Sequence, residues 1–153
     1  MVGPEVEKTA LVRHANRMFV TGANLTVPFF TIILRKAYGL GAITMAGGAY
    51  KTAYFCVSWP TGEFGGMGLE GAVKLGYRDD LAAIEDPEER LAKYEEMVAK
   101  LYDIGKAVNQ ASYFGFDDAI DPADSRKWVI NLLKSVHPAP KRDGKKRPAV
   151  DSW

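Results

Sequence analysis

The sequence predicts an α/β fold with parallel strand pairing. Helical and apolar extended segments alternate along the 153 residues, and this order is typical of parallel sheets because parallel strands need crossover connections. Residues 26–34 (TVPFFTIIL) form a nearly unbroken, partly β-branched apolar run, which predicts a strand buried on both faces. Helix-start patterns at Asp86-Pro87 and Asp121-Pro122 mark two later helices.

The first half of the chain contains the elements expected around this strand. Pro4 suits a first helical turn, and an apolar face from Leu11 to Gly22 continues the pattern. After residues 26–34, a polar, glycine-bearing turn precedes a small-residue helix that begins near Gly41. The further expected elements are a helix over 4–22, a second short buried strand over 53–57, a glycine-rich loop over 58–68 and a short helix over 69–76.

The second half is predicted to be mainly helical. Asp86 is the expected N-cap of a helix over 87–109, and Asp121 begins a helix that ends at His137-Pro138. Between them, residues 117–120 form a short strand or an extended connection. Two clear strands make a poor sheet, so we expect the chain to be part of a larger fold or to oligomerise.

Length and charge indicate one domain over residues 1–137 and a basic C-terminal tail over 138–153. The tail holds five basic and two acidic residues while the whole chain carries a net charge of only +1. The remaining body is therefore slightly acidic, which argues against nucleic acid as a partner. No run reaches the roughly 18 apolar residues of a membrane helix, and the single Cys56 fits a reducing cytoplasm.

Side chains that usually carry chemistry are sparse. The sequence has no nucleophile elbow, no P-loop and no cluster of metal ligands, so we expect no metal. His14 is expected on a helix surface and Cys56 inside a strand, where it packs as a small hydrophobe. Asp79 and Asp80 are expected to form a solvated turn.

The segment Tyr38-Gly39-Leu40-Gly41-Ala42 allows two interpretations. Backbone N–H groups at a helix start attract negative charge, and two that converge form an oxyanion hole. The same glycines also suit a tight strand-to-helix turn with no chemistry.

Three ordered motifs resemble the carboxyltransferase subunits of biotin-dependent acyl-CoA carboxylases, of the propionyl-CoA and acetyl-CoA carboxylase β-subunit type. The motifs are RKAYGLGAITMAGG (35–48), WPTGEFGGMGLEGAV (59–73) and DDAIDPADSRKWVINLL (117–133), and the similarity runs from about residue 8 to 147. The resemblance implies a crotonase-like (ClpP/crotonase) superhelix of β-β-α units. It also implies that the chain is the later part of the family's second, biotin-side domain.

The implied reaction moves a carboxyl group from carboxybiotin on a carrier protein to the α-carbon of an acyl-CoA such as acetyl- or propionyl-CoA. By resemblance, the backbone amides of Gly41 and Ala42 form the biotin-side oxyanion hole and Thr44 shapes the acyl pocket. The remaining positions carried over are the turn residues Tyr38 and Gly39 and the adjoining loop residues Trp59, Pro60 and Thr61.

Two departures from the family pattern bear on this assignment. The family's Gly-Gly-Ala is here Gly39-Leu40-Gly41-Ala42, one residue longer, and by resemblance we expect the first domain to lie outside these 153 residues. The implied partners are therefore a first carboxyltransferase domain, a biotin carboxyl carrier protein, a biotin carboxylase subunit and further copies of the chain.

Two alternatives to the interpretation as part of a carboxyltransferase remain. One is a non-catalytic assembly module of the same fold, which the missing domain and the longer turn favour. The other is a stand-alone crotonase-type hydratase or hydrolase, against which the lack of a suitably placed pair of glutamates argues.

Overall fold

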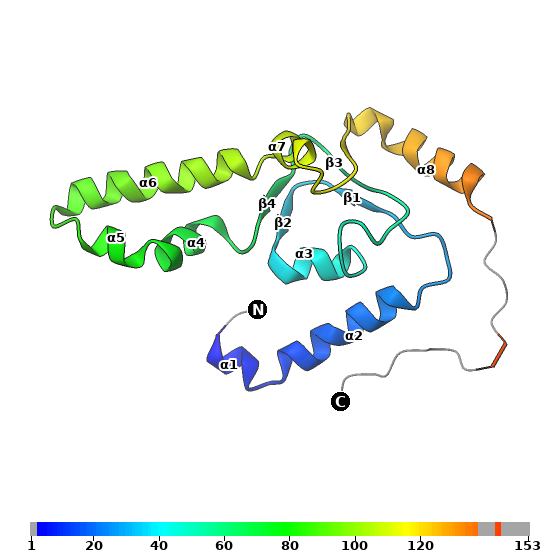
Figure 1. Ribbon diagram of the computed structural model, residues 1–153, viewed down its shortest axis with the longest axis horizontal. Coiled ribbons are helices and arrows are strands. Elements are labelled where there is room, and N and C mark those ends of the chain that lie inside the picture. The colour runs from blue at the N-terminus through cyan, green and yellow to red at the C-terminus, as the bar shows by residue number, and fades with distance from the viewer. Residues whose placement is uncertain (1–2, 138–142, 145–153) are drawn as a thin grey trace.

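Two small parallel sheets form the centre of the protein (Figure 1). The computed structural model describes residues 3–137 and 143–144. The first sheet has the strand order β1-β3-β5, and the second pairs β2 with β4. The strands are β1 (Thr31–Ile33), β2 (Lys36–Tyr38), β3 (Cys56–Ser58), β4 (Glu63–Gly65) and β5 (Asp118–Ala119).

The chain follows the same path twice through these sheets. In the first turn β1 and β2 lead into α3 (Gly39–Met45), and in the second β3 and β4 lead into α4 (Leu69–Gly76). Corresponding strands pair in parallel, with Thr31 opposite Cys56 and Lys36 opposite Glu63. This is the β-β-α winding that a crotonase-like superhelix requires, and it confirms the expected parallel pairing.

The expected strand over 26–34 is much shorter than the sequence suggests. Only Thr31–Ile33 pair in the ladder, and Val27 is 63% exposed. Pro28 lacks the N–H that a ladder needs, and the segment before residue 31 lies outside the sheet. The expectation of burial on both faces is therefore wrong for most of this run. The second strand is shifted from 53–57 to Cys56–Ser58.

The second sheet was not expected from the sequence. Residues 35–40 are predicted to be a polar turn and 58–68 a loop, yet they contain β2 and β4. Each strand has three residues, which is too short to show the alternation that reveals a strand. The short strand expected within 117–120 is present as β5.

The N-terminal helix is interrupted. The expected helix over 4–22 is two helices, α1 (Pro4–Glu7) and α2 (Leu11–Ala23), because Ala10 has a left-handed backbone with φ of 59°. The Thr9 hydroxyl donates to the Val6 carbonyl at 2.6 Å and closes the first helix. The break lets α2 take its own direction beside α3 (Figure 1).

A helical hairpin projects from the second sheet (Figure 1). It comprises α4, α5 (Arg78–Ala82) and α6 (Pro87–Ile104), and α7 (Ala107–Ser112) follows. Asp86 caps α6 as predicted and accepts the Glu88 N–H at 3.1 Å. The helix expected over 87–109 stops at Ile104 because the Gly105 carbonyl accepts the Phe64 N–H of β4 at 2.8 Å. Asp79 and Asp80 are exposed but lie in α5 rather than in a turn.

The last helix, α8 (Ser125–Ser135), covers the first sheet. Asp121 caps a short 3-10 turn (Pro122–Asp124) that precedes it, accepting the Ala123 N–H at 2.8 Å. The spacing of five apolar residues predicts a buried stripe on this helix: Trp128, Val129, Leu132, Leu133 and Val136. Leu132 is buried but Leu133 is exposed, so the buried stripe is narrower than predicted.

Two apolar clusters hold the sheets and helices together. The cluster between the two sheets is centred on Phe64 and Phe116, whose stacked rings lie 4.8 Å apart. The cluster under α8 contains Phe55, Val57 and Leu132. Over the described residues, no helix is both long and apolar enough to cross a membrane. The basic tail predicted over 138–153 lies outside the described residues except for 143–144.

Candidate functional site

The strand-to-helix connection after β2 has the geometry of a backbone amide site. Tyr38 is the N-cap of α3, and Gly39 follows with φ of 60°, a left-handed value that favours glycine. A Cβ at Gly39 would lie 2.8 Å from the Gly66 carbonyl oxygen. The first and second turns of the superhelix therefore touch here, and only a residue without a side chain fits.

The position of the helix start determines which amides are available. Because α3 begins at Gly39, the N–H groups of Gly39, Leu40 and Gly41 have no acceptor four residues earlier within the helix. The Ala42 N–H is the first that meets an in-register acceptor, the Tyr38 carbonyl. We refer to residues 39–42 as the amide turn.

The amide turn borders an apolar cavity of about 480 Å³. Its wall brings together four of the residues expected from the sequence, Tyr38, Gly39, Gly41 and Thr44. Ala42 borders a neighbouring cavity that Tyr38 and Gly41 also line. The volume is in the range of small-molecule sites, which are mostly apolar with a few well-placed polar groups.

Two polar side chains at this site, those of Thr44 and Tyr38, already make hydrogen bonds to other groups of the protein. Thr44 is buried, and its hydroxyl donates to the Leu40 carbonyl in the same helix. The Tyr38 hydroxyl donates to a Glu63 carboxylate oxygen at 3.1 Å, which links β2 to β4. Burial first, and then the Glu63 carboxylate, raise the pKa of the Tyr38 phenol. Neither group is arranged as a catalytic base.

The loop residues carried over from the resemblance lie apart from the amide turn. The Trp59 indole donates to the Ser125 hydroxyl at 2.9 Å and packs on the cluster under α8. Pro60 is exposed, and the Thr61 hydroxyl donates to the Leu34 carbonyl. Within the described residues, none of the three lines a cavity that contains Gly41.

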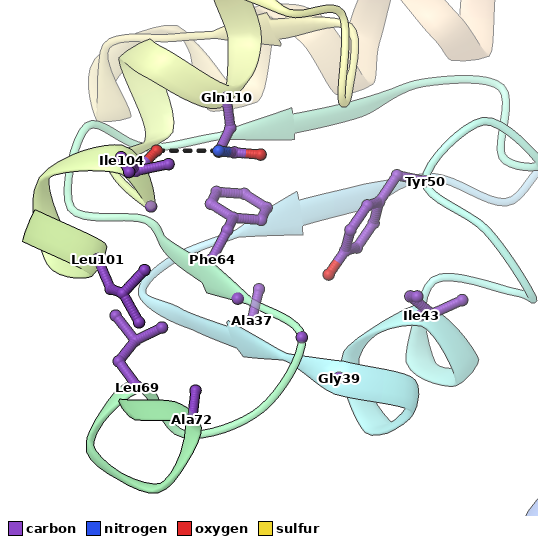
Figure 2. Close-up of a pocket in the computed structure, with 13 residues that line it drawn as sticks. Ala37, Gly39, Ile43, Tyr50, Phe64, Leu69, Ala72, Leu101, Ile104 and Gln110 are labelled. Carbon is purple, nitrogen blue, oxygen red and sulfur yellow. Dashed lines mark hydrogen bonds between the residues drawn. The ribbon is translucent and has the colours of Figure 1, made fainter. Parts of the chain in front are cut away.

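A further cavity, of about 460 Å³, is lined by Gly39 of the amide turn together with side chains of the sheets and helices (Figure 2). Figure 2 shows the aromatic rings of Phe64 and Tyr50 in it, with Leu101 and Ile104 at one side. The Gln110 amide is occupied, because its nitrogen donates to the Ile104 carbonyl at 2.9 Å. Gly39 and Gly66 line both this inner cavity and the apolar cavity, so their backbone forms the shared wall.

The other chemistry-bearing side chains do not join the site. His14 and His137 are exposed, on α2 and after α8. Cys56 is fully buried in β3, and burial, reinforced by the Asp117 carboxylate, raises the pKa of its thiol to about 12. In the part of the chain that the structure describes, no group of His, Cys, Asp and Glu side chains could hold a metal ion.

Sequence reasoning missed the helix that closes the cavity. Leu11, Ala15 and Phe19 of α2 and Met67 of the β4–α4 connection line it. The spacing of the α2 residues, one turn apart, identifies an apolar face. Nothing in that spacing says that the face borders the amide turn, because the break at Ala10 sets the direction of the helix.

Comparisons with known proteins place this chain in one family. A family model described as the carboxyl transferase domain matches residues 1–148. The carboxyltransferase subunit of propionyl-CoA carboxylase from Haloferax mediterranei is 35% identical over 139 residues, which are 88% of this chain and 25% of that protein. The 12S subunit of methylmalonyl-CoA carboxyltransferase from Propionibacterium freudenreichii subsp. shermanii is 32% identical over 136 residues, 86% of this chain and 25% of that protein.

Solved structures agree. A single-chain, multi-domain long-chain acyl-CoA carboxylase is 55% identical, with a TM-score of 0.73 over 86% of this chain and 13% of that one. The transcarboxylase 12S structure has a TM-score of 0.79 and 27% identity over 100% of this chain and 29% of that one. The chain thus spans about a quarter of the length of the curated relatives it matches. The expected crotonase-like fold, present as part of a domain, is confirmed, and the chain belongs to the carboxyl transferase domain family.

Proposed function

We propose that this chain is the biotin-side part of a biotin-dependent acyl-CoA carboxyltransferase. The observation that carries the proposal is the amide turn at the edge of an apolar cavity, at the start of α3. Backbone N–H groups that have no internal acceptor stabilise a developing oxyanion without any side-chain acid. The family membership of the chain makes the ureido oxygen of biotin the fitting anion.

The residues present suit this cofactor. When bound, carboxybiotin supplies the carboxyl group and, on its ureido nitrogen, the base for the α-proton of the acyl-CoA. The chain then needs to contribute only hydrogen-bond donors, a dry surface and orientation. The amide turn contributes the donors, and side chains of α2 and Met67 line the apolar cavity beside them.

Helix geometry supports Gly41 as one donor and bears on the choice of the second. The resemblance pairs Gly41 with Ala42, whose N–H is in register with the Tyr38 carbonyl. The Leu40 N–H has no such acceptor. We therefore propose Gly41 as the principal donor, with Leu40 and Ala42 as competing candidates for the second.

The acyl-CoA is proposed to carry a longer chain than acetyl or propionyl. The 55% identical relative is described as a long-chain acyl-CoA carboxylase, whereas the curated relative that acts on propionyl-CoA is 35% identical. The proposed partners are a first carboxyltransferase domain, a biotin carboxyl carrier protein, a biotin carboxylase subunit and further copies of the chain, in the cytoplasm.

The test is biotin-dependent decarboxylation, the reverse half-reaction, of malonyl-CoA, methylmalonyl-CoA and a 2-alkylmalonyl-CoA with a long alkyl chain. It is run on the chain alone and after mixing with a first-domain partner. We expect turnover only in the mixture, and a Gly41→Pro change, which removes the N–H, lowers kcat about 100- to 1,000-fold. Gly41→Ala keeps the N–H and is the matched control. Equal activity of the two variants in an intact complex would contradict the amide role.

Leu40→Pro and Ala42→Pro identify the second donor. Proline is tolerated in the first turn of a helix, so Leu40→Pro removes mainly one N–H. Ala42→Pro also removes the first internal hydrogen bond of α3, to the Tyr38 carbonyl, so its free energy of unfolding is measured alongside its activity. The variant that loses activity to the same extent as Gly41→Pro marks the second donor. Leu40→Ala is the matched control for a loss of side-chain contacts.

A non-catalytic assembly module is the second candidate. Large apolar side chains are exposed on the helical hairpin, among them Leu75 and Leu91, and they suit burial against another protein. A stable complex with a first-domain partner that decarboxylates none of the three thioesters would favour this function.

A further inference from the structure

The second sheet carries a polar pair of side chains directly before the amide turn. Side chains alternate between the two faces of a strand. Ala37 of β2 and Phe64 of β4 are buried and face the inner cavity (Figure 2). Tyr38 and Glu63 therefore lie on the opposite face of the same two strands. Because Tyr38 is the last residue before the amide turn, a contact that holds its side chain also holds the start of that turn.

A glycine makes room for the Tyr38 ring. Tyr38 pairs with Gly65 in the parallel ladder. A Cβ at Gly65 would lie 3.2 Å from Cδ1 of Tyr38 and 2.6 Å from Cδ2 of Leu69. The ring therefore lies against bare backbone of β4, and its hydroxyl reaches Glu63, two residues before Gly65, at 3.1 Å.

Groups outside the pair support it. The Arg35 guanidinium Nε lies 3.5 Å from the carboxylate oxygen of Glu63 that Tyr38 does not use. The Tyr102 hydroxyl of α6 donates to Glu70 of α4 at 2.8 Å. Burial first, then the Glu63 carboxylate and then Tyr102 raise the pKa of the Tyr38 phenol. The phenol therefore keeps its proton and remains a hydrogen-bond donor to Glu63.

We propose that Glu63 is a positioning residue for the amide turn: its carboxylate anchors the Tyr38 side chain and thereby fixes the direction of the N–H groups that follow. The inference rests on the proposed carboxyl transfer, because it assumes that these N–H groups meet a developing negative charge. Tyr38 is the N-cap of α3, and the left-handed Gly39 comes next. A small rotation of the Tyr38 backbone therefore turns the N–H groups of Leu40 and Gly41 away from that charge.

The turn needs an anchor because its own backbone gives it little rigidity. The N–H groups of residues 39–41 have no acceptor within the helix, and glycine is the most conformationally free residue. In the described part of the chain β2 pairs with β4 alone, so the other edge of β2 does not support the turn. Donors stabilise a transition state most when they are oriented before the reaction, and the bond from Tyr38 to Glu63 supplies that orientation.

The experiment measures biotin-dependent decarboxylation by the chain mixed with a first-domain partner. Glu63→Ala and Tyr38→Phe each remove the anchoring hydrogen bond. We expect each to lower kcat about 10- to 100-fold and to leave the KM for free biotin nearly unchanged, because the donors act in the transition state. The double variant should lose no more than either single variant, since both changes remove one bond. Glu63→Gln keeps an acceptor oxygen and should stay within about threefold of wild type.

Two comparisons separate positioning from a general loss of stability. In a Gly41→Pro chain, Glu63→Ala should lower kcat by less than about threefold, because the principal donor that it orients is already missing. Full, additive losses in this background overturn the inference. Glu95→Ala, at an exposed position of α6, is the matched control and leaves kcat unchanged. Equal losses in Glu95→Ala and Glu63→Ala also overturn the inference.

A measurement without turnover separates this inference from the proposed function. Relaxation of ¹⁵N in the 153-residue chain reports the order parameters of the Leu40 and Gly41 N–H groups. We expect rigid values of about 0.85 in wild type and Glu63→Gln, and lower values in Glu63→Ala and Tyr38→Phe. Order parameters and chemical shifts that match wild type in both of the last two variants overturn the inference. Lower values in a chain whose complex decarboxylates none of the thioesters support Glu63 as the anchor and reject the proposed function.

Discussion

Gly39 combines a left-handed backbone conformation with a close contact to the backbone of Gly66, so a side chain is disfavoured there for two reasons. We expect Gly39→Ala to lower the free energy of unfolding by about 2–5 kcal/mol. A left-handed conformation costs an alanine about 1–2 kcal/mol. The new Cβ would also stand 2.8 Å from the Gly66 carbonyl oxygen, and forced overpacking of this kind typically costs about 1–3 kcal/mol.

Urea unfolding of the chain, followed by circular dichroism, measures this change. Gly71→Ala is the matched control, because Gly71 lies in α4 with nothing within 4 Å of the position of a Cβ. There the same substitution should stabilise the chain by up to about 1 kcal/mol, the difference in helix propensity.

Gly39→Asn separates the cost of the left-handed backbone from the cost of the close contact. Asparagine tolerates the left-handed region but still carries a Cβ. A Gly39→Ala protein within about 0.5 kcal/mol of wild type would refute the reasoning, since surface substitutions without strain stay in that range.

Three further predictions concern stability and ionisation. Asp86→Ala removes the acceptor for the Glu88 N–H and should lower the free energy of unfolding by about 1 kcal/mol; an unchanged thermal melt would contradict the capping role. Buried Cys56 should not react with a thiol reagent at pH 8 until the chain unfolds. Because burial raises the pKa of its thiol to about 12 from 9.0, the unfolded chain loses this proton first. Stability should therefore fall as pH rises from about 9 towards 12, and less steeply in Cys56→Ala. A double-mutant cycle of Trp59→Phe and Ser125→Ala should give a coupling of about 1 kcal/mol for their 2.9 Å hydrogen bond, and additive effects would argue against the bond.

Helix starts were the part of the fold most open to prediction. Asp86 and Asp121 cap their turns as expected, because an N-cap depends on residues within one turn of chain. Helix ends were less accessible. The helix from Pro87 stops at Ile104 because Gly105 bonds to β4, and that strand lies about forty residues away in the sequence.

The sheets were only partly predictable. The run 26–34 correctly indicated a parallel strand, but its apolar character extended beyond the three residues that pair. Strands β2 and β4 carried no recognisable pattern, since each is three residues long and its neighbours include glycines. Their pairing depends on the winding of the chain, which no short segment encodes.

The sequence by itself determined the family and the place of the amide turn. Both depend on the order and spacing of a few residues, such as Tyr38-Gly39-Leu40-Gly41, that are contiguous in the chain. Only the tertiary structure decided which residues surround that turn. It placed Leu11, Ala15 and Met67 beside Gly41 and set Trp59 under α8. The physical reason is that a cavity is a gap between elements, and its walls depend on how those elements pack rather than on the local preference of any one of them.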